Sequence, residues 1–412
     1  MPLYGFGRDN HLGKGERMDK RFIVLGAGKM GRVAARALLE TPGQRVTLTD
    51  VQEEVLEAAK QEIGAVIGSQ ALERLETRRL DASDEIELVH ALMGHDVVLN
   101  ALYFTFNETV ARAAIKAGVH YTDLGGHVMG VTARVLALSE TAKEKGVTLI
   151  PDLGVAPGMI NVLAGYGARH METVERIHMY VGGIPLRPKP PFGYAHVFSL
   201  EGLFDHYEDE AEIIREGRRV RVPALSEIET VYFPYFGPLE AFHTAGGTST
   251  LIDTFRDAGH LMYKTVRYPG HAAQMGLLKT LGFFDREKKV EIDTVKMVVR
   301  PRDVLLAILK KTLDLGEDDD VVLLRVLVQG LVQGQKLERC YETITFRHPH
   351  TQVTAMAQTT AYSLVVVAEM LARGEIEAYG ALPPETSVPG KTYMERMEAR
   401  GVAIQTKERL ID

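Results

Sequence analysis

The segment Phe22-Ile-Val-Leu-Gly26-Ala-Gly28-Lys-Met-Gly31 decides the fold of this chain. It has the pattern of a short apolar strand that breaks into a glycine turn, and the turn opens a helix that continues from Val33 to Leu39. In such a turn Gly26 permits the tight bend, Gly28 lets the backbone approach a pyrophosphate, and Gly31 lets the helix pack closely. The helix N-terminus presents unpaired N–H groups to the phosphates. The pattern predicts a dinucleotide-binding βαβ unit with contacts from Gly26, Gly28, Lys29, Met30 and Gly31.

The second strand of this unit ends in an acidic residue, which bears on the kind of dinucleotide. Asp50 closes the apolar run Val46–Asp50, about 20 residues after the glycine turn. A carboxylate at this place accepts hydrogen bonds from a ribose 2′-hydroxyl and repels a 2′-phosphate. No arginine follows in Val51-Gln-Glu-Glu. We therefore expect NAD rather than NADP as the cofactor.

The length and composition are those of a globular protein that can form two hydrophobic cores. The chain has 412 residues, of which 45% are hydrophobic, and a net charge of −7 that is spread along its length. The absence of a long Lys/Arg block argues against nucleic acid or an anionic membrane as a partner. Cys340 is the single cysteine, so we expect no internal disulfide and a reducing compartment, the cytoplasm. Residues 1–20 lack an apolar stretch, and we expect a disordered leader rather than a secretory signal.

Beyond the glycine turn, apolar strands alternate with amphipathic helices, as in a doubly wound parallel sheet. The third to sixth strands are expected at Arg78–Asp81, Asp96–Asn100, Val119–Asp123 and Val147–Pro151. Residues at the carboxyl ends of parallel strands face the cofactor crevice. This selects further candidates for contacts with the dinucleotide, namely Asp81, Asn100, Ala101, Asp123 and the nearby Gly125. Any one of them is equally compatible with a helix cap or a turn.

The sequence changes character near Asp152. Strand patterns become longer and more widely spaced, as in Val174–Val181 and in the pair Val321–Val328 and Lys336–Phe346. Gly330 and Gly334 fall between the members of this pair, which predicts the loop of a hairpin. We therefore expect an α/β protein in which a Rossmann doubly wound parallel sheet is joined to a second α+β domain with a mixed or antiparallel sheet.

The run Thr354–Ala372 is apolar almost all round, but Gln358, Tyr362 and Glu369 lie within it. We expect a buried helix of the core rather than a membrane span. The predicted organisation is a leader over 1–20, an NAD-binding Rossmann domain over 21–151, a substrate-binding and oligomerisation domain over 152–353, and a C-terminal helical segment over 354–412 that packs back on the Rossmann domain.

Four segments are denser in glycine and polar residues than a scaffold requires. They are Asp123–His127, Pro151–Gly158, Tyr194–Gly202 and Glu240–Ser249. The first two follow the fifth and sixth strands, so the fold itself delivers them to the nicotinamide end of the crevice. Gly158 opens the next helix, whose N-terminus is a second site for an anion or a carbonyl group.

Longer strings in the second half of the chain resemble those of bacterial and archaeal L-lysine 6-dehydrogenases, which belong to the saccharopine dehydrogenase superfamily. The strings are Asp152–Asn161, Tyr180–Pro185, His196–Gly202, Glu240–Thr250 and Pro301–Leu306, and the resemblance extends from Arg21 to Gly401. The Asp-x-Gly-x-x-Pro-Gly element is shared across the superfamily, whereas the longer strings are similar to the lysine enzymes in particular. The resemblance implies oxidation of the ε-carbon of L-lysine by NAD, without a metal. The products would be NADH, ammonia and allysine, which closes spontaneously to 1-piperideine-6-carboxylate.

This implied chemistry needs a base, because the ε-ammonium group has a reference pKa of about 10.4 and cannot release a hydride while it is protonated. The later loss of ammonia needs a group that exchanges protons through a water. The candidates for catalysis are Asp152, His127, His196 and His243. Each histidine is equally compatible with a core or surface role.

The candidates for substrate binding are Tyr194, Thr244, Arg267 and Gly158. Arg267 or Arg187 is expected to pair with the α-carboxylate of the substrate, since a planar guanidinium forms two parallel hydrogen bonds with a carboxylate. Either arginine is equally compatible with a surface ion pair.

Two alternative functions remain open from the sequence. One is a related dehydrogenase of a larger secondary amine, such as saccharopine or carboxynorspermidine. Saccharopine carries a second amino-acid headgroup and would demand further cationic residues, whereas the four segments above are rich in Gly, His, Phe and Thr. The other is a non-catalytic NAD-binding sensor. No Gly-x-Ser-x-Gly or His-Glu-x-x-His motif indicates hydrolytic or metal-dependent chemistry. For the enzyme we expect a homodimer or homotetramer.

Overall fold

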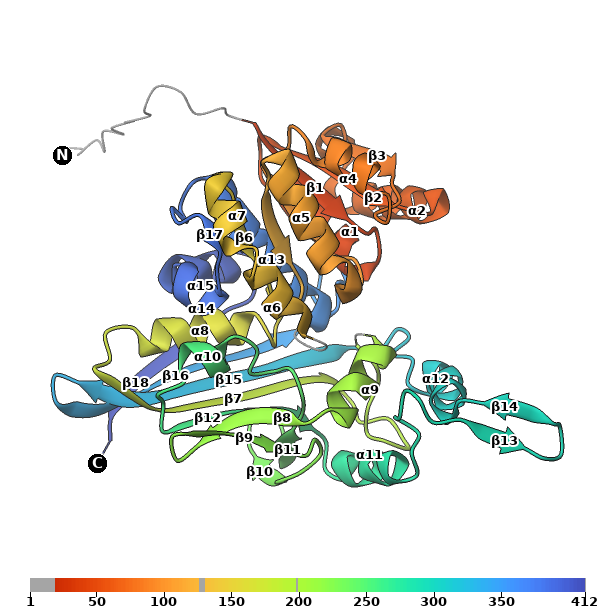
Figure 1. Cartoon of the computed structure of the whole chain (residues 1–412), viewed down its shortest axis with the longest axis vertical. Coiled ribbons are helices and arrows are strands. Elements are labelled where there is room, and N and C mark those ends of the chain that lie inside the picture. Colours follow the sequence, from red (N-terminus) through yellow and green to blue (C-terminus); the bar gives the residue numbers. More distant parts are fainter. Residues whose placement is uncertain (1–18, 126–129, 198, 412) are drawn as a thin grey trace, which may run out of the picture.

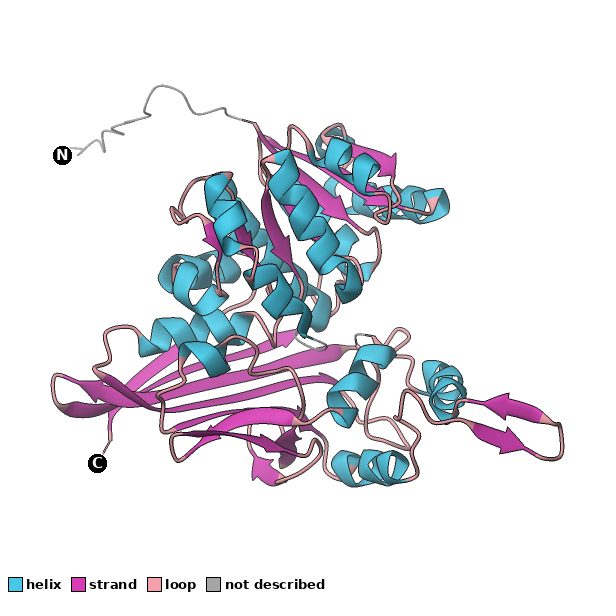
Figure 2. Ribbon diagram, viewed as in Figure 1, coloured by secondary structure: helices cyan, strands magenta, loops and turns pink. Residues whose placement is uncertain are grey.

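The computed structural model describes residues 19–125, 130–197 and 199–411. The candidate His127 and the expected leader, apart from Asp19 and Lys20, lie outside these residues. Figures 1 and 2 show an α/β body above a long, open sheet, with helices lying between the two.

The upper body is built on seven parallel strands in the order β17-β6-β5-β4-β1-β2-β3. The strand order reverses at β1, because β1 pairs in parallel with β2 on one side and β4 on the other. A crevice opens at the carboxyl ends of strands at such a switch point. The predicted doubly wound parallel sheet is confirmed. The strands are β1 (Lys20–Leu25), β2 (Gln44–Asp50), β3 (Leu75–Arg79), β4 (Val97–Asn100), β5 (His120–Asp123), β6 (Thr148–Ile150) and β17 (Gly380–Ala381).

Helices with small and aliphatic inner faces cover this sheet. In the first helix, Ala34, Ala37 and Leu38 are fully buried, so the helix lies close to the strands. The fourth begins at the N-cap Asp84, whose carboxylate accepts hydrogen bonds from the N–H groups of Ile86 and Glu87. The helices are α1 (Lys29–Leu39), α2 (Glu53–Ile67), α3 (Ser69–Leu72), α4 (Glu85–Leu92), the 3₁₀ turn η1 (Phe104–Phe106), α5 (Asn107–Ala117), α6 (Val131–Leu136) and α7 (Ser139–Glu144).

The apolar run near the C-terminus forms the buried helix α13 (Ala355–Ala372), as predicted. It is the one described helix that is long and apolar enough to cross a membrane, but 94% of it is buried inside the protein. It packs on α1, where the guanidinium of Arg36 donates to the hydroxyl of Tyr362 (3.0 Å). Its buried Glu369 accepts a hydrogen bond from Gln44 (2.8 Å). The polar residues within this run therefore anchor the helix to the first sheet.

The lower body is a mixed sheet of nine strands, and this part of the predicted fold is also confirmed. Its main path is β10-β11-β12-β7-β15-β16-β18, with β8 paired to β12 and β9; β12 and β7 run parallel, and the other pairs are antiparallel. The strands are β7 (Thr173–Pro185), β8 (Ala211–Arg215), β9 (Arg218–Val222), β10 (Glu229–Val231), β11 (Leu239–His243), β12 (His260–Arg267), β15 (Asp320–Val332), β16 (Gln335–Phe346) and β18 (Gln405–Leu410).

Further helices and a separate hairpin complete the lower body. The helix α8 packs on β15 of the long sheet, while α9, α11 and α12 gather around their own apolar cluster at one end. The elements are α8 (Met159–Ala168), α9 (Leu200–Glu208), α10 (Leu251–Thr254), α11 (His271–Thr280), β13 (Val290–Ile292), β14 (Met297–Val299), α12 (Pro301–Thr312), α14 (Pro384–Ser387) and α15 (Gly390–Ala399).

Two details differ from the sequence-based expectations. Gly330 lies inside β15 rather than in the hairpin loop, and the turn consists of Gln333 and Gly334, both with positive φ. A Cβ at position 330 would lie 2.1 Å from the carbonyl oxygen of Thr173, so this glycine serves a close approach of β7. The segment over 354–412 is also not wholly helical or confined to the Rossmann domain, because β18 pairs with β16. Its six residues are all exposed, so it lacked the apolar alternation that reveals a strand.

Gly31→Ala should lower the free energy of unfolding by about 1–3 kcal/mol, the usual range for overpacking. The added Cβ would lie 1.7 Å from the carbonyl oxygen of Gly26, so α1 would have to move. Gly28→Ala is the matched control, since its Cβ would meet no atom within 4 Å. Urea unfolding of both variants measures the difference. Equal stability of the two would show that α1 does not press on the glycine turn.

Candidate active site

The glycine turn lies at the switch point of the first sheet. Gly26 adopts a φ of +91°, and its N–H donates to the carbonyl oxygen of Thr49 (2.9 Å), which ties the turn to β2. The carboxylate of Asp50 accepts hydrogen bonds from the N–H groups of Ala27 (2.9 Å) and Gln52 (3.1 Å). A Cβ at Gly28 would face open space, so a phosphate can approach the N-terminus of α1 there.

A cavity of ≈ 760 Å³ opens beside this turn, and we call it the turn cavity. Both bodies line it. The upper body contributes Gly28, Lys29, Met30, Arg32 and Ala101, and the lower body contributes His196, Asp314 and Arg347. Desolvation lowers the pKa of the Lys29 ammonium, which the acidic Asp320 and Asp314 partly offset. Lys29 at the N-terminus of α1 and Arg347 from the lower body suit the two negative charges of a pyrophosphate, whereas Arg32 is paired with Glu62 (2.6 Å).

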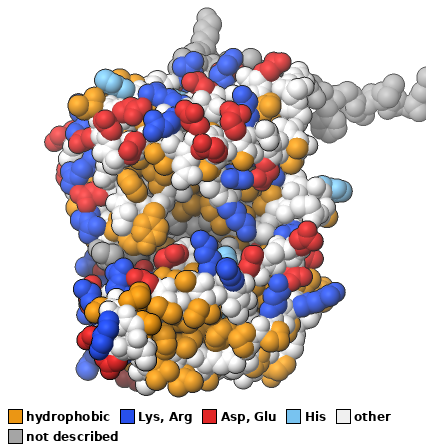
Figure 3. Space-filling model, turned by 90° about the vertical axis from the view of Figure 1, so that its right-hand side faces the viewer, with side chains coloured by type: hydrophobic (Ala, Val, Ile, Leu, Met, Phe, Trp, Pro, Cys, Tyr) orange, Lys and Arg blue, Asp and Glu red, His pale blue; other side chains and the backbone are white. Residues whose placement is uncertain are grey.

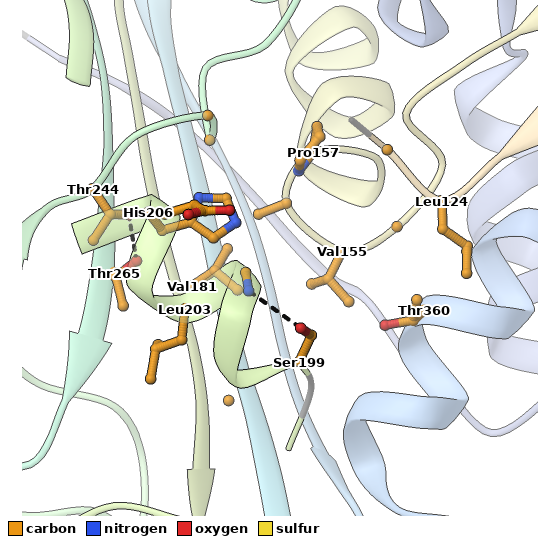
Figure 4. Close-up of a pocket in the computed structure, with 18 of the residues that line it drawn as sticks. Leu124, Val155, Pro157, Val181, Ser199, Leu203, His206, Thr244, Thr265 and Thr360 are labelled. Atoms are coloured by element: carbon orange, nitrogen blue, oxygen red, sulfur yellow. Dashed lines mark hydrogen bonds between the residues drawn. The ribbon is translucent and has the colours of Figure 1, made fainter. Parts of the chain in front are cut away.

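A smaller cavity of ≈ 320 Å³ adjoins the turn cavity, and Met30 and Ser199 line both. We call it the inner cavity. In Figure 4 the His206 ring stands between Thr244 and Thr265 on one side and the loop that carries Val155 and Pro157 on the other. The walls combine aliphatic side chains with a few polar groups: Leu102, Leu124, Val155, Val181, Leu203, Met356, Asp205, His206, Tyr207, Thr244, Tyr263, Thr265 and Arg267.

Strand β12 places Arg267 in the wall of the inner cavity, where the side chain is only 3% exposed. One Nη atom donates to the carbonyl oxygen of Val266 (2.9 Å), and the guanidinium lies over the ring of Tyr194 (4.6 Å). Its Nε makes no hydrogen bond within the described residues, and none of their carboxylates forms an ion pair with it. A buried charge normally has a partner. Arg267 is therefore fitted to receive an anionic group that enters this cavity.

Helix α9 places His206 in the same cavity. Its Nδ1 lies 2.6 Å from the carbonyl oxygen of Ala245. Because a carbonyl oxygen only accepts, we assign the proton of the neutral ring to Nδ1, which leaves the lone pair on Nε2. Burial is the main cause that lowers the pKa of His206, and the charge of Arg267 acts in the same direction. The imidazole is thus neutral at neutral pH and able to accept a proton.

Two buried carboxylates lie behind the cavity wall rather than in it. Asp123 accepts hydrogen bonds from the N–H groups of Gly125 (2.7 Å) and Asp152 (2.9 Å) and from the hydroxyl of Tyr121 (2.7 Å). Burial, followed by the charge of Asp152, raises the pKa of Asp123 to about 7. Asp152 accepts from the hydroxyls of Thr132 (2.9 Å) and Ser249. In this arrangement the pair holds the loops that bear Gly125 and Pro157, and neither carboxylate lines the inner cavity.

The structure gathers some of the predicted site residues and separates others. Those that line one of the two cavities are Gly28, Lys29, Met30, Ala101, Gly125, His196, Thr244 and Arg267. His196 lines the turn cavity, not the inner one. Gly26, Gly31 and Asp50 frame the turn itself.

The remaining candidates lie outside both cavities. The amide of Asn100 donates to Asn107 (2.8 Å), and the carboxylate of Asp81 accepts from its neighbour Ser83, so both shape turns. His243 is fully buried beside Glu227 (3.2 Å). Tyr194 lies beneath Arg267. Gly158 donates its N–H to Asn161 (2.9 Å), which occupies the N-terminus of α8 that was expected to receive an anion. Arg187 is exposed away from the inner cavity.

His206, Leu203 and Thr265 are functional candidates that the sequence-based selection missed. A signal for the first two exists in the sequence, because Ser199, Leu203 and His206 recur at the spacing of one helix face, which α9 turns toward the cavity. Thr265 gave no such signal. It reaches the cavity because β12 alternates its side chains and places Thr265 and Arg267 on the same face.

The upper sheet is parallel and carries a glycine turn at its switch point, and the lower sheet closes the cavity in front of that turn. This arrangement defines a two-domain dinucleotide-binding protein of the Rossmann class. Residues 22–150 match the family model described as saccharopine dehydrogenase NADP binding domain, and residues 154–402 match the saccharopine dehydrogenase C-terminal domain. The chain belongs to the saccharopine dehydrogenase family, which confirms the superfamily expected from the sequence.

Individual relatives are distant. The chain is 24% identical over 286 residues to saccharopine dehydrogenase (NADP(+), L-glutamate-forming) of Pyricularia oryzae, a match that covers 66% of this chain and 59% of that protein. It is 22% identical to carboxynorspermidine synthase of Vibrio cholerae, over 94% of this chain and 96% of that protein. The solved apo saccharopine dehydrogenase (L-Glu forming) from Saccharomyces cerevisiae has the same fold, with a TM-score of 0.76 and 17% identity over 95% of this chain and 100% of that chain. The chain thus spans about three-fifths of the fungal protein first named above.

Proposed function

We propose that this protein is an NAD-dependent L-lysine 6-dehydrogenase. It would convert L-lysine, NAD⁺ and water to allysine, ammonium, NADH and a proton. The observation that carries the proposal is the buried guanidinium of Arg267, which has no carboxylate partner among the described residues and lines a small cavity that adjoins the glycine turn. If the α-carboxylate of an amino acid binds Arg267, the amine of its side chain is the other polar group that the cavity has to accommodate.

The residues of the turn cavity fit a dinucleotide. The N–H groups at the start of α1, with Lys29 and Arg347, would bind the pyrophosphate, and Met30 stands at the boundary of the two cavities. When bound, NAD would supply the acceptor for the hydride that leaves the ε-carbon. The chain's own contribution is to hold that carbon in a largely apolar pocket beside His206.

The carboxylate of Asp50 supports NAD over NADP. It is fixed beside the turn by Ala27 and Gln52, at the end of the strand where a ribose 2′-hydroxyl is normally bound. The family model and several relatives carry NADP in their names. In this chain the cation beside that position is Arg79, whose Nε donates to the carbonyl oxygen of Val51 (3.1 Å). We therefore expect Asp50 to favour NAD, with Arg79 as the neighbouring cation that would favour NADP.

The inner cavity suits lysine better than a larger amine. Its volume of ≈ 320 Å³ is at the lower end of the range for small-molecule sites. Val155, Val181 and Leu203 offer aliphatic surface for the methylene chain, and Arg267 offers one partner for one carboxylate. Saccharopine carries a second amino-acid headgroup, for which the inner cavity supplies no second arginine among the described residues. A dehydrogenase of a secondary amine remains the alternative, because relatives bear such names.

His206 is suited to move the protons that the reaction requires. Its Nε2 would take the proton of the ε-ammonium before the hydride leaves, since only the neutral amine can release it. After releasing that proton to solvent, Nε2 would take a proton from the water that attacks the resulting iminium carbon and return it to the nitrogen that departs as ammonia. The hydrogen bond from Nδ1 to Ala245 keeps the ring oriented through these steps.

Purified protein mixed with NAD and L-lysine should produce NADH absorbance and an equal amount of ammonia. Saccharopine in place of lysine is the matched comparison. Turnover of saccharopine without turnover of lysine would reject the substrate and retain the reaction class. Binding of NAD with turnover of neither amine would instead support the non-catalytic sensor.

Asp50→Ser should weaken NAD binding by about tenfold or more, the equivalent of one charge-assisted hydrogen bond of ~1.5–3 kcal/mol, and leave NADP binding unchanged or stronger. The serine removes the carboxylate that accepts from the ribose and repels a 2′-phosphate. Calorimetric titration with each dinucleotide measures the change. Tighter binding of NADP than of NAD by the wild-type chain would mean that Arg79, rather than Asp50, determines the cofactor preference.

Arg267→Met should raise the KM for L-lysine by about a hundredfold or more, because one partner of a buried charge pair is worth about 3–5 kcal/mol. Cadaverine, which is lysine without the α-carboxylate, provides the control substrate. The wild type should prefer lysine strongly, and the variant should lose that preference while its NAD affinity is kept. A preference that survives the substitution would mean that the carboxylate binds elsewhere. Arg267→Lys, which keeps the charge, should recover part of it.

His206→Gln should lower kcat by about 10²–10⁴-fold, the usual contribution of a general base. Glutamine keeps a donor toward Ala245 and a similar size. In the wild type, kcat should fall as the pH drops through the lowered pKa of His206, below the ordinary value of about 6.5, because protonation removes the base. The variant should lose this acid limb of the profile. An unchanged limb would assign the base to another residue.

A further inference from the structure

Residues 287–299 form a hairpin that projects from the end of the lower body, and we call it the arm. Its strands β13 and β14 pair only with each other in the part of the chain that is described, with Val290 opposite Val299. Every residue from Glu287 to Val298 is exposed. Figure 1 shows the arm extending beyond α12, away from the rest of the chain.

The arm is apolar to a degree that a solvated hairpin does not require. Val290, Ile292, Val295, Met297 and Val298 are 40–64% exposed. A lone two-stranded hairpin is marginally stable in water. β13 alternates polar and apolar residues, and the pairing of Ile292 with Met297 gives the arm an apolar face that nothing in the described residues covers. The arm therefore has the composition of an element that is covered on assembly.

Two helices beside the arm extend the same surface. Leu277 on α11 and its C-cap Leu281 are four residues apart, as are Val304 and Ile308 on α12, and these four side chains are 41–62% exposed. Together with the five arm residues they make up what we call the apolar patch. Figure 3 views the molecule from the side on which the arm ends, and hydrophobic side chains dominate its lower part.

We propose that the apolar patch binds a second copy of this chain through a two-fold interface. At 60–120 Å² for each aliphatic side chain, half of it exposed, the nine residues offer roughly 300–500 Å² of apolar area. A standard interface buries about 800 Å² on each partner, of which a little over half is apolar. The patch thus supplies the apolar content of one stable interface, and it is as large as the apolar patches that on other proteins often serve a function.

The patch is surrounded by both positive and negative side chains. Two copies related by a two-fold axis can therefore place opposite charges against each other, as a two-fold interface requires. The arm carries Lys289, Glu291, Asp293 and Lys296, and the N-terminal turn of α12 adds Asp303. A cavity of ≈ 710 Å³ lies at the base of the arm, with Val298, Val304 and Ala307 among its apolar lining residues and Lys289, Arg300 and Asp303 among its charged ones. A copy turned by 180° brings its own apolar arm and both signs of charge to this cavity.

Such docking would also brace the wall of the inner cavity. The arm begins after Arg286 and ends before Arg302, and both guanidinium groups bind the carboxylate of Asp205 on α9 (2.9 and 2.7 Å). Asp205 precedes His206 and lines the inner cavity. A second copy that holds the arm in place would therefore also restrain α9.

Sedimentation velocity of the full chain at micromolar concentration tests the proposal without reference to substrate. The wild type should sediment with at least twice the mass of one chain. The double variant Val298→Lys and Ile308→Lys should show half of the wild-type mass, because it places four unpaired charges in the apolar interface. Both side chains are exposed in the single chain, so thermal unfolding should remain cooperative.

Ile86→Lys is the matched control, since Ile86 is 74% exposed on α4, in the other body. It should leave the mass unchanged. A wild-type chain that sediments as a monomer would overturn the proposal, and so would a double variant that keeps the wild-type mass.

Discussion

Helix α13 holds the two sheets together, and both cavities depend on this constraint. The N–H groups of Ala355 and Met356 donate to the carboxylate of Asp320 (2.7 and 2.9 Å), which begins β15 of the lower sheet. A carboxylate at a helix N-terminus is stabilised by the helix dipole. The rest of the helix packs on α1 and on strands β4 and β5 of the upper sheet. One buried helix thereby sets the glycine turn against the face of the lower sheet.

The charges near the two cavities divide into paired and unpaired groups, and this division supports the proposed chemistry. Asp205 is neutralised by Arg286 and Arg302, and the carboxylates of Asp123 and Asp152 are enclosed behind the wall. In the inner cavity Arg267 alone, among the described charged residues that line it, has no ion-pair partner. Because a charge acts most strongly where water is excluded, the contact of a substrate carboxylate with this guanidinium would dominate recognition.

The fold was largely predictable from sequence, whereas the inner cavity was not. The glycine turn and the strands of the upper sheet follow from local patterns, so their positions could be predicted to within a few residues. The inner cavity depends on which strand faces lie opposite each other across long separations in sequence. His243 and Arg267 both occur in polar stretches, but only the second lines the cavity. The exposed strand β18 lacked any apolar signal, and His206 was recognisable only once α9 was treated as a helix with one face in the site.

In the proposed complex the α-carboxylate of the substrate lies on Arg267, and the reacting carbon lies at the other end of the substrate. Mass spectrometry of NADH formed from deuterated lysine tests this placement most directly. L-lysine deuterated at the ε-carbon should transfer one deuterium to NADH, and L-lysine deuterated at the α-carbon should transfer none. Deuterium in NADH from the α-carbon would contradict the account, because it would require the substrate to bind in the opposite direction.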